Sequence, residues 1–523
     1  MHAEPRRISL LELLHPDGAA ARARVLGSAC PAALRPAGAT PEGGPADLAV
    51  LAPAAGERRE AGWLERAAEA AARDVAADGV VVALLPARLR ARAGALLREH
   101  GLELARPLAH VPRGEGNDYL LSLAPASLRH AVGVLMPLHP ARRRAALLAL
   151  RLGHWPGAAL RLASDAGVAI VARRPGARPV AHWLFAGAED GALVMRAKWR
   201  GARGVAVVHG IASGATQPTV VAKLALSAEG TTAGTTESGE LARLARLGGA
   251  ARAAGARVPE ARALTLGGGR PALAESVVPG EPLSVLLARH PRRLEAALDR
   301  VTEWLERWHR ETRRVQPLDE ARLDRWLLAP AAVLAPGLED GDAYLAWLRA
   351  RCARVLGRAV PLVAAHNDLT TSNLLLGAHG ELGVVDWEEA EAEALPLGDF
   401  FYCVTDALTA TRRVGGRAVA FDRCFGHAGH YSALATRLGH RLQGAVELPE
   451  GVAELSLHAC WLRHALNEEA KALPHRGRPF LAILRALAGR REQLPGGGAA
   501  GAASGVPAWP AGEGAPVPGA VPR

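Results

Sequence analysis

Three side chains whose oxygen atoms could bind a metal ion lie between residues 361 and 402. Asp368 is followed five positions later by Asn373, and Asp386 stands thirteen positions after Asn373. Two short apolar runs separate Asn373 from Asp386, and each is typical of a β-strand. A strand, a turn and a second strand would bring these side chains together beside Asp368. Carboxylate and amide oxygens suit Mg²⁺, and a carboxylate beside a bound nucleotide phosphate can orient an incoming hydroxyl group.

The same residues carry a resemblance to a known family. The pattern His366-x-Asp368-x-x-x-x-Asn373, followed by Asp386, resembles the phosphotransfer loop and metal-binding strand of the aminoglycoside phosphotransferase and choline kinase families. That resemblance implies a bilobal, protein-kinase-like α+β domain that uses ATP and Mg²⁺. It makes Asp368 the catalytic carboxylate and Asn373 and Asp386 the metal ligands. We expect His366 to organise the loop rather than carry protons, because positioning dominates this chemistry. Asp399 resembles the family's carboxylate that braces the loop, with helix N-capping as its other possible role.

An acidic run follows the predicted metal strand. Asp386, Trp387 and Glu388 form a motif that resembles choline and ethanolamine kinases more than antibiotic kinases. Glu388 is therefore a candidate for contact with the substrate. Three further acidic residues extend the run and could attract a cationic acceptor, although charge runs usually lie on solvated loops; they are Glu389, Glu391 and Glu393.

Residues 191–285 read as the small β lobe. Lys223 follows Val220-Val221-Ala222 in a predicted strand, and lysine occurs elsewhere only at positions 198 and 471. The resemblance implies that Lys223 contacts the α- and β-phosphates and pairs with an acidic residue on the next helix. Glu237 is our first choice for that partner and Glu240 the second, while both also suit a solvated helix start.

Backbone groups of the small lobe are expected to hold the rest of the nucleotide. The turn Arg-Gly-Ala-Arg-Gly contains Gly201 and Gly204, whose amides could lie over the phosphates, although a glycine-containing hairpin is often only a hairpin. A later hairpin ends at the segment that contains Glu275 and Val277, where the resemblance implies a hinge that binds adenine through its backbone.

Residues 286–493 read as the helical large lobe. Leu294, Leu298, Val301, Leu305 and Trp308 are spaced by four, three, four and three positions, which predicts one buried helix face. A second helix is expected from Tyr344 to Val355. Residues 494–523 are rich in Gly, Ala and Pro and are predicted to be disordered.

The N-terminal third has a different pattern. From residue 47 apolar runs alternate with amphipathic stretches, which favours a parallel α/β sheet. Residues 1–125 therefore predict a shortened Rossmann-like domain that resembles the second half of a class I methyltransferase. The glycine-rich turn that holds such a methyl donor is missing, so we expect a non-catalytic domain used for packing or for a protein partner. Residues 126–190 are predicted to be a helical connector.

Composition narrows the class of protein. The 523 residues have a formal net charge of +11, but the arginines are scattered rather than clustered, so we expect no nucleic-acid partner. Five cysteines without a paired spacing indicate reduced thiols and a cytoplasmic location, and no apolar run is long enough to cross a membrane. The sequence thus predicts an ATP-dependent kinase for a hydroxyl of a sugar, amino sugar or amino alcohol. The alternative is a non-catalytic nucleotide-binding scaffold with a kinase fold.

Overall fold

A computed structural model describes most of the chain as two compact units. The described residues are 8–20, 22–31, 34–36, 45–57, 60–112, 117–136, 140–151, 167–185, 191–200, 203–227, 237–426, 428–470 and 478–490. One unit comprises Met1–Leu241 and Glu260–Val277, and the other comprises Ala242–Pro259 and Val278–Arg523. The predicted disordered tail, residues 494–523, lies outside the described residues.

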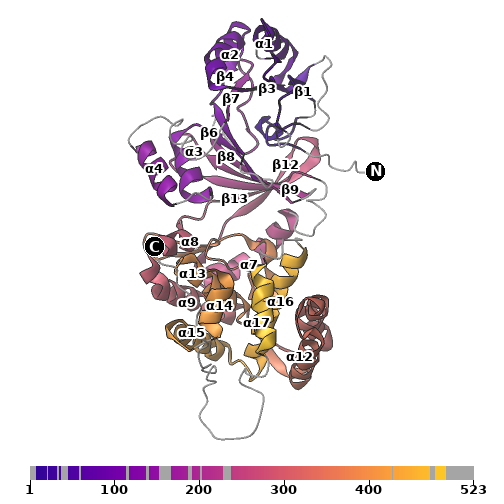
Figure 1. The fold of residues 1–523 in the computed structure, drawn as a ribbon, viewed down its shortest axis with the longest axis vertical. Coiled ribbons are helices and arrows are strands. Elements are labelled where there is room, and N and C mark those ends of the chain that lie inside the picture. The colour runs from indigo at the N-terminus through magenta and orange to yellow at the C-terminus, as the bar shows by residue number, and fades with distance from the viewer. Residues whose placement is uncertain are drawn as a thin grey trace. The chain divides into compact units, whose positions relative to one another are not determined.

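The first unit is built on a 12-stranded sheet with the order β1-β2-β3-β7-β5-β6-β8-β9-β10-β13-β12, in which β4 pairs with β7 (Figure 1). Its strands are β1 (Ala23–Leu26), β2 (Ala46–Leu51), β3 (Val75–Leu85), β4 (Glu103–Leu104), β5 (Leu108–Pro112), β6 (Asn117–Ser122), β7 (Gly167–Arg173), β8 (Ala192–Arg200), β9 (Arg203–Ile211), β10 (Val220–Ala225), β12 (Ala261–Leu266) and β13 (Arg270–Ser276). Its helical segments are η1 (Glu12–Leu14), α1 (Trp63–Asp74), α2 (Ala87–Glu99), α3 (Pro125–His130), η3 (Ala131–Leu135), α4 (Pro140–Arg151), η4 (Gly267–Gly269) and the start of α7 (Glu237–Ala253).

The apolar run in β3 is explained by burial on both faces of the sheet. Val80 and Val82 enter one core, whereas Val81 and Ala83 enter a second core that also contains residues of α1 and α2. Side chains alternate between the two faces of a strand, so a strand covered on both sides reads as a continuous apolar run. Helix α1 contributes buried residues at a helical spacing, namely Leu64, Ala67, Ala68, Ala71 and Ala72.

The N-terminal strands partly follow the predicted alternation. β1, β2 and β3 are parallel, and α1 connects β2 to β3. The assignment of residues 1–125 to a Rossmann-like domain stays a prediction. The expected helical connector, residues 126–190, contains α3, η3 and α4, but it also contributes strand β7, which lies between β3 and β5. The run GVAIVAR in β7 is rich in β-branched residues and is too short for a typical helix, which favours a strand.

The N-terminal region and the strands of the expected small lobe share one sheet rather than two. β5 and β6 pair in antiparallel register, and β6 continues the sheet by pairing with β8. Residues from the N-terminus, such as Leu11 and Leu14, lie in the same core as Ala222 and Leu224 of β10. The strand that contains Lys223 is therefore supported on one face by the N-terminal region.

The second unit is mainly helical and contains two small sheets, with the orders β11-β18-β17-β14 and β15-β16-β19. Its strands are β11 (Ala256–Arg257), β14 (Glu281–Pro282), β15 (Arg314–Pro317), β16 (Ala359–Ala365), β17 (Leu374–Leu376), β18 (Leu382–Val384) and β19 (Glu391–Ala394). Its helical segments, besides most of α7, are α8 (Leu283–Arg289), η5 (Pro291–Arg293), α9 (Leu294–Thr312), α10 (Glu320–Leu323), η6 (Asp324–Leu328), α11 (Ala329–Leu334), η7 (Ala335–Gly337), α12 (Gly341–Val355), η8 (Trp387–Glu389), α13 (Gly398–Ala410), α14 (Arg417–Phe425), α15 (His430–Val446), α16 (Val452–Ala470) and α17 (Pro479–Gly489).

The two helices expected from periodicity in this unit are confirmed. All five residues of the predicted stripe are buried on α9, and α12 buries residues from Tyr344 to Val355 at helical spacing. Among the residues that the structure describes, no helix combines the length and the apolar character needed to span a membrane.

Candidate active site

The loop that contains Asp368 and Asn373 connects β16 to β17. The side-chain amide of Asn373 donates hydrogen bonds to the backbone oxygen of Asp368 at 2.9 Å and to its Oδ2 at 3.1 Å. β17 then pairs with β18 in antiparallel register, with Leu374 opposite Val384. The backbone N–H of Val385 donates to the carbonyl of Asn373 at 3.0 Å. The predicted hairpin is therefore present, and it places Asp386 one residue beyond a direct contact with Asn373.

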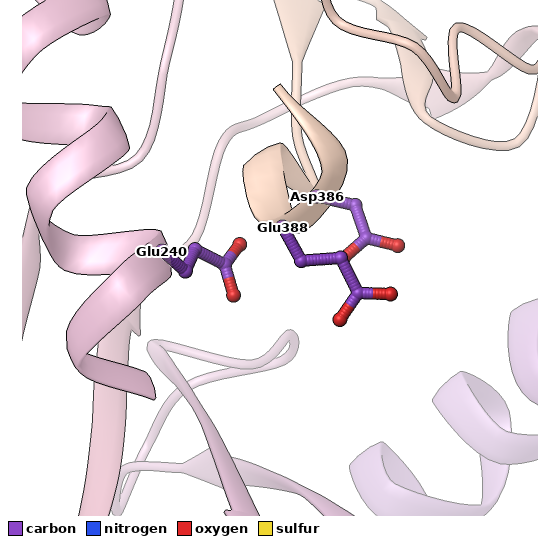
Figure 2. A group of neighbouring side chains, drawn as sticks. All are labelled: Glu240, Asp386 and Glu388. Atoms are coloured by element: carbon purple, nitrogen blue, oxygen red, sulfur yellow. The ribbon is translucent and has the colours of Figure 1, made fainter. Parts of the chain in front are cut away.

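Asp386 begins a tight turn at the end of β18. Its φ of 69° lies in the left-handed region, where a non-glycine residue is uncommon and aspartate is among the more tolerated types. Trp387, the next residue, is fully buried and donates from Nε1 to the carbonyl of Val384 at 3.1 Å. Figure 2 shows Asp386 and Glu388 projecting from this turn, and Glu240 projecting from α7. Carboxylate oxygens of Asp386 and Glu388 lie within 4.8 Å of each other.

His366 is fully buried at the start of the loop. Its Nε2 lies 3.0 Å from the carbonyl oxygen of Val385, and since a carbonyl can only accept, Nε2 carries the proton. The imidazole ring also packs against Trp387, with ring centroids 5.0 Å apart. These contacts connect the loop to the hairpin strand behind Asp386, which is the geometry expected of a residue that organises the loop.

Asp399 binds the same loop from the second position of α13. Its carboxylate accepts from the backbone N–H of His366 at 2.7 Å and from that of Asn367 at 2.8 Å. Asn367 has a left-handed φ of 62°, so these bonds hold a turn that is costly for a residue other than glycine. Leu397 occupies the N-cap position of α13, and no side-chain capping bond is formed there. The carboxylate therefore braces the loop instead of capping the helix.

Burial and neighbouring charges raise the pKa of Asp368 to about 7. Desolvation is the largest cause, and the negative charge of Asp386 is the next. The hydrogen bond from Asn373 lowers the pKa, while the charges of Glu389 and Asp406 raise it further. A carboxyl group with its pKa near neutrality can both accept and release a proton at physiological pH.

Arginines of the same unit pair with the acidic run after Glu388. Arg463 contacts Glu389 at 3.1 Å and Glu391 at 2.9 Å. Arg322 contacts Glu393 at 2.8 Å. Each of the three carboxylates thus has a guanidinium partner, although their side chains remain 33% to 39% exposed and two arginines offset only part of their charge.

Lys223 lies in β10 of the first unit, between two buried carboxylates. Its Nζ is 2.8 Å from Oε1 of Glu240 and 3.4 Å from Oε2 of Glu275. Ala222 and Leu224 point into the core shared with the N-terminal region, so the lysine side chain emerges on the other face of the sheet. The pairing on α7 goes to Glu240, our second choice. Glu237 is the first residue of α7, and its side chain lies outside what the structure describes.

Of the other residues predicted at the nucleotide site, Gly204 and Glu275 lie near the ends of interior strands of the same sheet. Gly201 lies outside the described residues, and Gly204 is the buried second residue of β9. Glu275 lies near the end of β13, and Val277 follows that strand in a half-buried loop. Glu275 lines a cavity of about 730 Å³, together with Phe185, Thr219 and ten other residues.

Three residues that the sequence did not single out lie close to the loop. Asp406 of α13 accepts two hydrogen bonds from Thr371, which stands between Asp368 and Asn373. Arg417 of α14 forms an ion pair with Asp406. A signal was present in the sequence, because Asp406 stands seven positions after Asp399 and hence on the same face of a helix. This spacing indicated that Asp399 and Asp406 share a helix face, but it did not identify Thr371 as the partner of Asp406.

Comparison with known proteins agrees with the motif. Residues 214–415 match the family described as the phosphotransferase enzyme family. The predicted resemblance is therefore confirmed over these residues, and with it the kinase-like α+β fold class and the expectation of a phosphotransferase enzyme. No curated protein matches the sequence.

Several solved structures are similar to part of the chain. The GDP and kanamycin complex of APH(2″)-IIia is 15% identical with a TM-score of 0.36, over 57% of this chain and 92% of that one. The complex of the aminoglycoside phosphotransferase APH(3″)-Id from Streptomyces rimosus with ADP and streptomycin is 16% identical with a TM-score of 0.32, over 49% and 88%. Macrolide 2′-phosphotransferase MphH from Brachybacterium faecium is 16% identical with a TM-score of 0.35, over 55% and 91%.

Proposed function

We propose that this protein transfers the γ-phosphoryl group of ATP to a hydroxyl group of a small molecule. One observation supports the proposal most directly: the amide of Asn373 is bonded to Asp368, and Asp386, two residues after the last paired residue of β18, lies near enough for its charge to raise the pKa of Asp368. A carboxylate and two further oxygen-bearing side chains then converge at one loop, as in-line phosphoryl transfer requires.

The side chains present suit Mg²⁺. The Nδ2 of Asn373 is directed at Asp368, so the Oδ1 of the same amide points away from it and is available as a ligand. Asp386 adds a carboxylate, and Glu388 places a second carboxylate within 4.8 Å of it. Hard oxygen ligands of this kind match Mg²⁺, which when bound would offset the negative charge of the nucleotide phosphates.

The protein's own groups would then orient the reactants. Asp368 accepts a hydrogen bond from the acceptor hydroxyl, aligns it with the γ-phosphorus and takes its proton late in the transfer. Lys223, held by Glu240 and Glu275, presents an ammonium group to the α- and β-phosphates. Backbone groups near Glu275 and Val277 hold the adenine.

The charge of the residues near Glu388 affects which acceptor molecules we expect to bind. Because Arg463 and Arg322 offset part of the negative charge of the acidic run after Glu388, that run attracts a polycation less strongly than three unpaired carboxylates would. We therefore place the acceptor among sugars, amino sugars and amino alcohols with few positive charges, and assign any contact with a cationic group to Glu388.

The test is binding and transfer measured on the same preparations. Calorimetry with Mg-ATP and Mg-GTP identifies the donor, and a panel of alcohols, sugars and amino sugars identifies the acceptor. We expect Asp368→Asn to retain Mg-ATP binding and lose transfer, and Asp386→Asn to lose both. Asp342→Asn, on an exposed position of α12, serves as the matched control. Nucleotide binding without transfer to any acceptor would instead support a non-catalytic scaffold.

A further inference from the structure

Helix α13 presents two carboxylates, on one face, to the loop that contains Asp368. Asp399 and Asp406 are seven residues apart, which is close to two full turns at about 3.6 residues per turn. Asp399 holds the backbone N–H groups of His366 and Asn367 at the start of the loop. Asp406 holds the middle of the loop through Thr371.

The contact between Asp406 and Thr371 is made twice to the same oxygen. The backbone N–H of Thr371 donates to Oδ2 of Asp406 at 2.8 Å, and the Thr371 hydroxyl donates to it at 2.6 Å. Thr371 is 1% exposed and Asp406 is 7% exposed, so water competes little for these bonds. Hydrogen bonds to a charged acceptor in such surroundings are stronger than bonds between neutral groups.

Arg417 compensates the buried charge of Asp406. Its guanidinium pairs with Oδ1, the oxygen that Thr371 does not use. The same guanidinium lies over the ring of Phe480 at 4.8 Å from the ring centroid, and over that of Tyr402 at 5.6 Å. Aromatic faces attract cations, so the arginine is fixed in place and leaves Oδ2 directed at Thr371.

This arrangement reaches both ends of the reacting loop. Thr371 stands three residues after Asp368 and two before Asn373, and Asn373 is itself bonded to the backbone oxygen and carboxylate of Asp368. A shift of Thr371 would therefore move the carboxylate and the amide together. A misplacement of about 1 Å in a positioned group can reduce a rate by roughly 100-fold.

We propose that Asp406 is a positioning residue for phosphoryl transfer, acting through Thr371 to hold Asp368 and Asn373 in register, with Arg417 as its counter-ion. This role rests on the proposed function of the loop. Asp406 acts on the loop, not on the substrate, so its loss is expected to lower the rate of turnover more than the affinity for the nucleotide.

Variants at both ends of the contact separate positioning from general stability. Thr371→Val removes the hydroxyl and preserves the side-chain shape, whereas Thr371→Ser keeps the hydroxyl donor and removes only the methyl group. Asp406→Asn turns one carboxylate oxygen into a donor group that faces either Thr371 or Arg417. Thr409→Val is the matched control, because Thr409 lies on α13 and its hydroxyl bonds only within the helix, to the carbonyl of Thr405 at 2.8 Å.

The first readout is turnover of Mg-ATP, measured by hydrolysis and by transfer to any acceptor found. We expect kcat to fall about 10- to 100-fold in Thr371→Val and Asp406→Asn, with KM for Mg-ATP changed by less than about threefold. Thr371→Ser should recover most of the rate, and Thr409→Val should match the wild type. Equal rates in Thr371→Val and Thr371→Ser would overturn the proposal.

The second readout does not depend on activity. Amide hydrogen exchange of a peptide that spans residues 366–373 should be at least about tenfold faster in Asp406→Asn, while peptides from α9 and α12 keep their wild-type rates. Unchanged exchange in the loop would refute the positioning role even if the wild type proved inactive. Wild-type protein without turnover would instead refute the proposed function alone.

Discussion

Replacing Lys223 with methionine would leave two buried carboxylates facing each other without the ammonium that lies between them. The side chains of Glu240 and Glu275 are 5% and 7% exposed, and that of Lys223 is 18% exposed. Removing one partner of a buried ion pair costs roughly 3–5 kcal/mol, because the remaining charge is uncompensated. We expect Lys223→Met to lower the free energy of unfolding of the first unit by an amount in that range.

The structure also predicts an asymmetry between the two partners. Glu240→Gln leaves Lys223 with Glu275 at 3.4 Å and with an amide oxygen that still accepts a hydrogen bond, so its cost should be only about 1–2 kcal/mol. The double variant that combines Lys223→Met with Glu240→Gln has one buried carboxylate fewer than Lys223→Met alone and should be more stable than that single variant. The coupling between the two sites is then about 1–3 kcal/mol.

Urea unfolding followed by circular dichroism gives these free energies, and amide exchange of peptides from β10 assigns the change to the first unit. Lys198→Met is the matched control, because Lys198 is exposed on β8, and it should change stability by no more than about 0.5 kcal/mol. Additive effects of the two substitutions would refute the reasoning, since they would show that Lys223 and Glu240 do not interact.

Three further predictions follow from the second unit. Asp399→Asn replaces one of two accepting oxygens with a donor, so a backbone N–H of His366 or Asn367 loses its partner. We expect a loss of about 2–4 kcal/mol in the free energy of unfolding and a lower kcat. An unchanged kcat would contradict the bracing role. The rate of transfer should fall as pH drops through about 7 or somewhat below, because the Asp368 carboxylate must be ionised and a bound cation lowers its pKa. A rate that does not change between pH 5.5 and 8 would count against this expectation. Burial lowers the pKa of His309 from 6.5 to about 4, so as pH falls the imidazole becomes protonated in the unfolded chain before it does in the folded protein. The free energy of unfolding therefore decreases as pH falls below 6.5. Between pH 7.5 and 5.5 that loss is about 1.3 kcal/mol, and urea unfolding should show the pH-dependent loss of stability to be smaller by this amount in His309→Gln than in the wild type.

Two helices and the β17–β18 hairpin of the second unit could be predicted from the spacing of residues along the sequence. The apolar residues of α9 recur every three or four positions, and that pattern alone places them on one face. The hairpin of β17 and β18 follows from two short apolar runs and a turn, so the approach of Asn373 to Asp386 was predictable. The sequence could not show that the acidic run after Glu388 is paired with Arg322 and Arg463, because those partners are about 70 positions away.

The first unit was less predictable for the same reason. Alternating runs indicated strands and helices, but not that β7 would lie between β3 and β5, or that β6 would pair with β8. Sheet order depends on which apolar faces cover one another, and this is decided over the whole unit. The choice between Glu237 and Glu240 likewise depended on the rotation of α7 relative to β10, which spacing along a single helix does not specify.

The sequence by itself determined which residues have the chemistry of phosphoryl transfer, since Asp368, Asn373 and Asp386 are identified by residue type and by distances of five and thirteen positions. Only the tertiary structure decided what holds them in place. Asp399 and Asp406 act on residues that precede them by more than 30 positions, and a contact of that length forms only when α13 packs against the loop. A local pattern can state that a carboxylate is present on a helix face, but its partner is set by the fold.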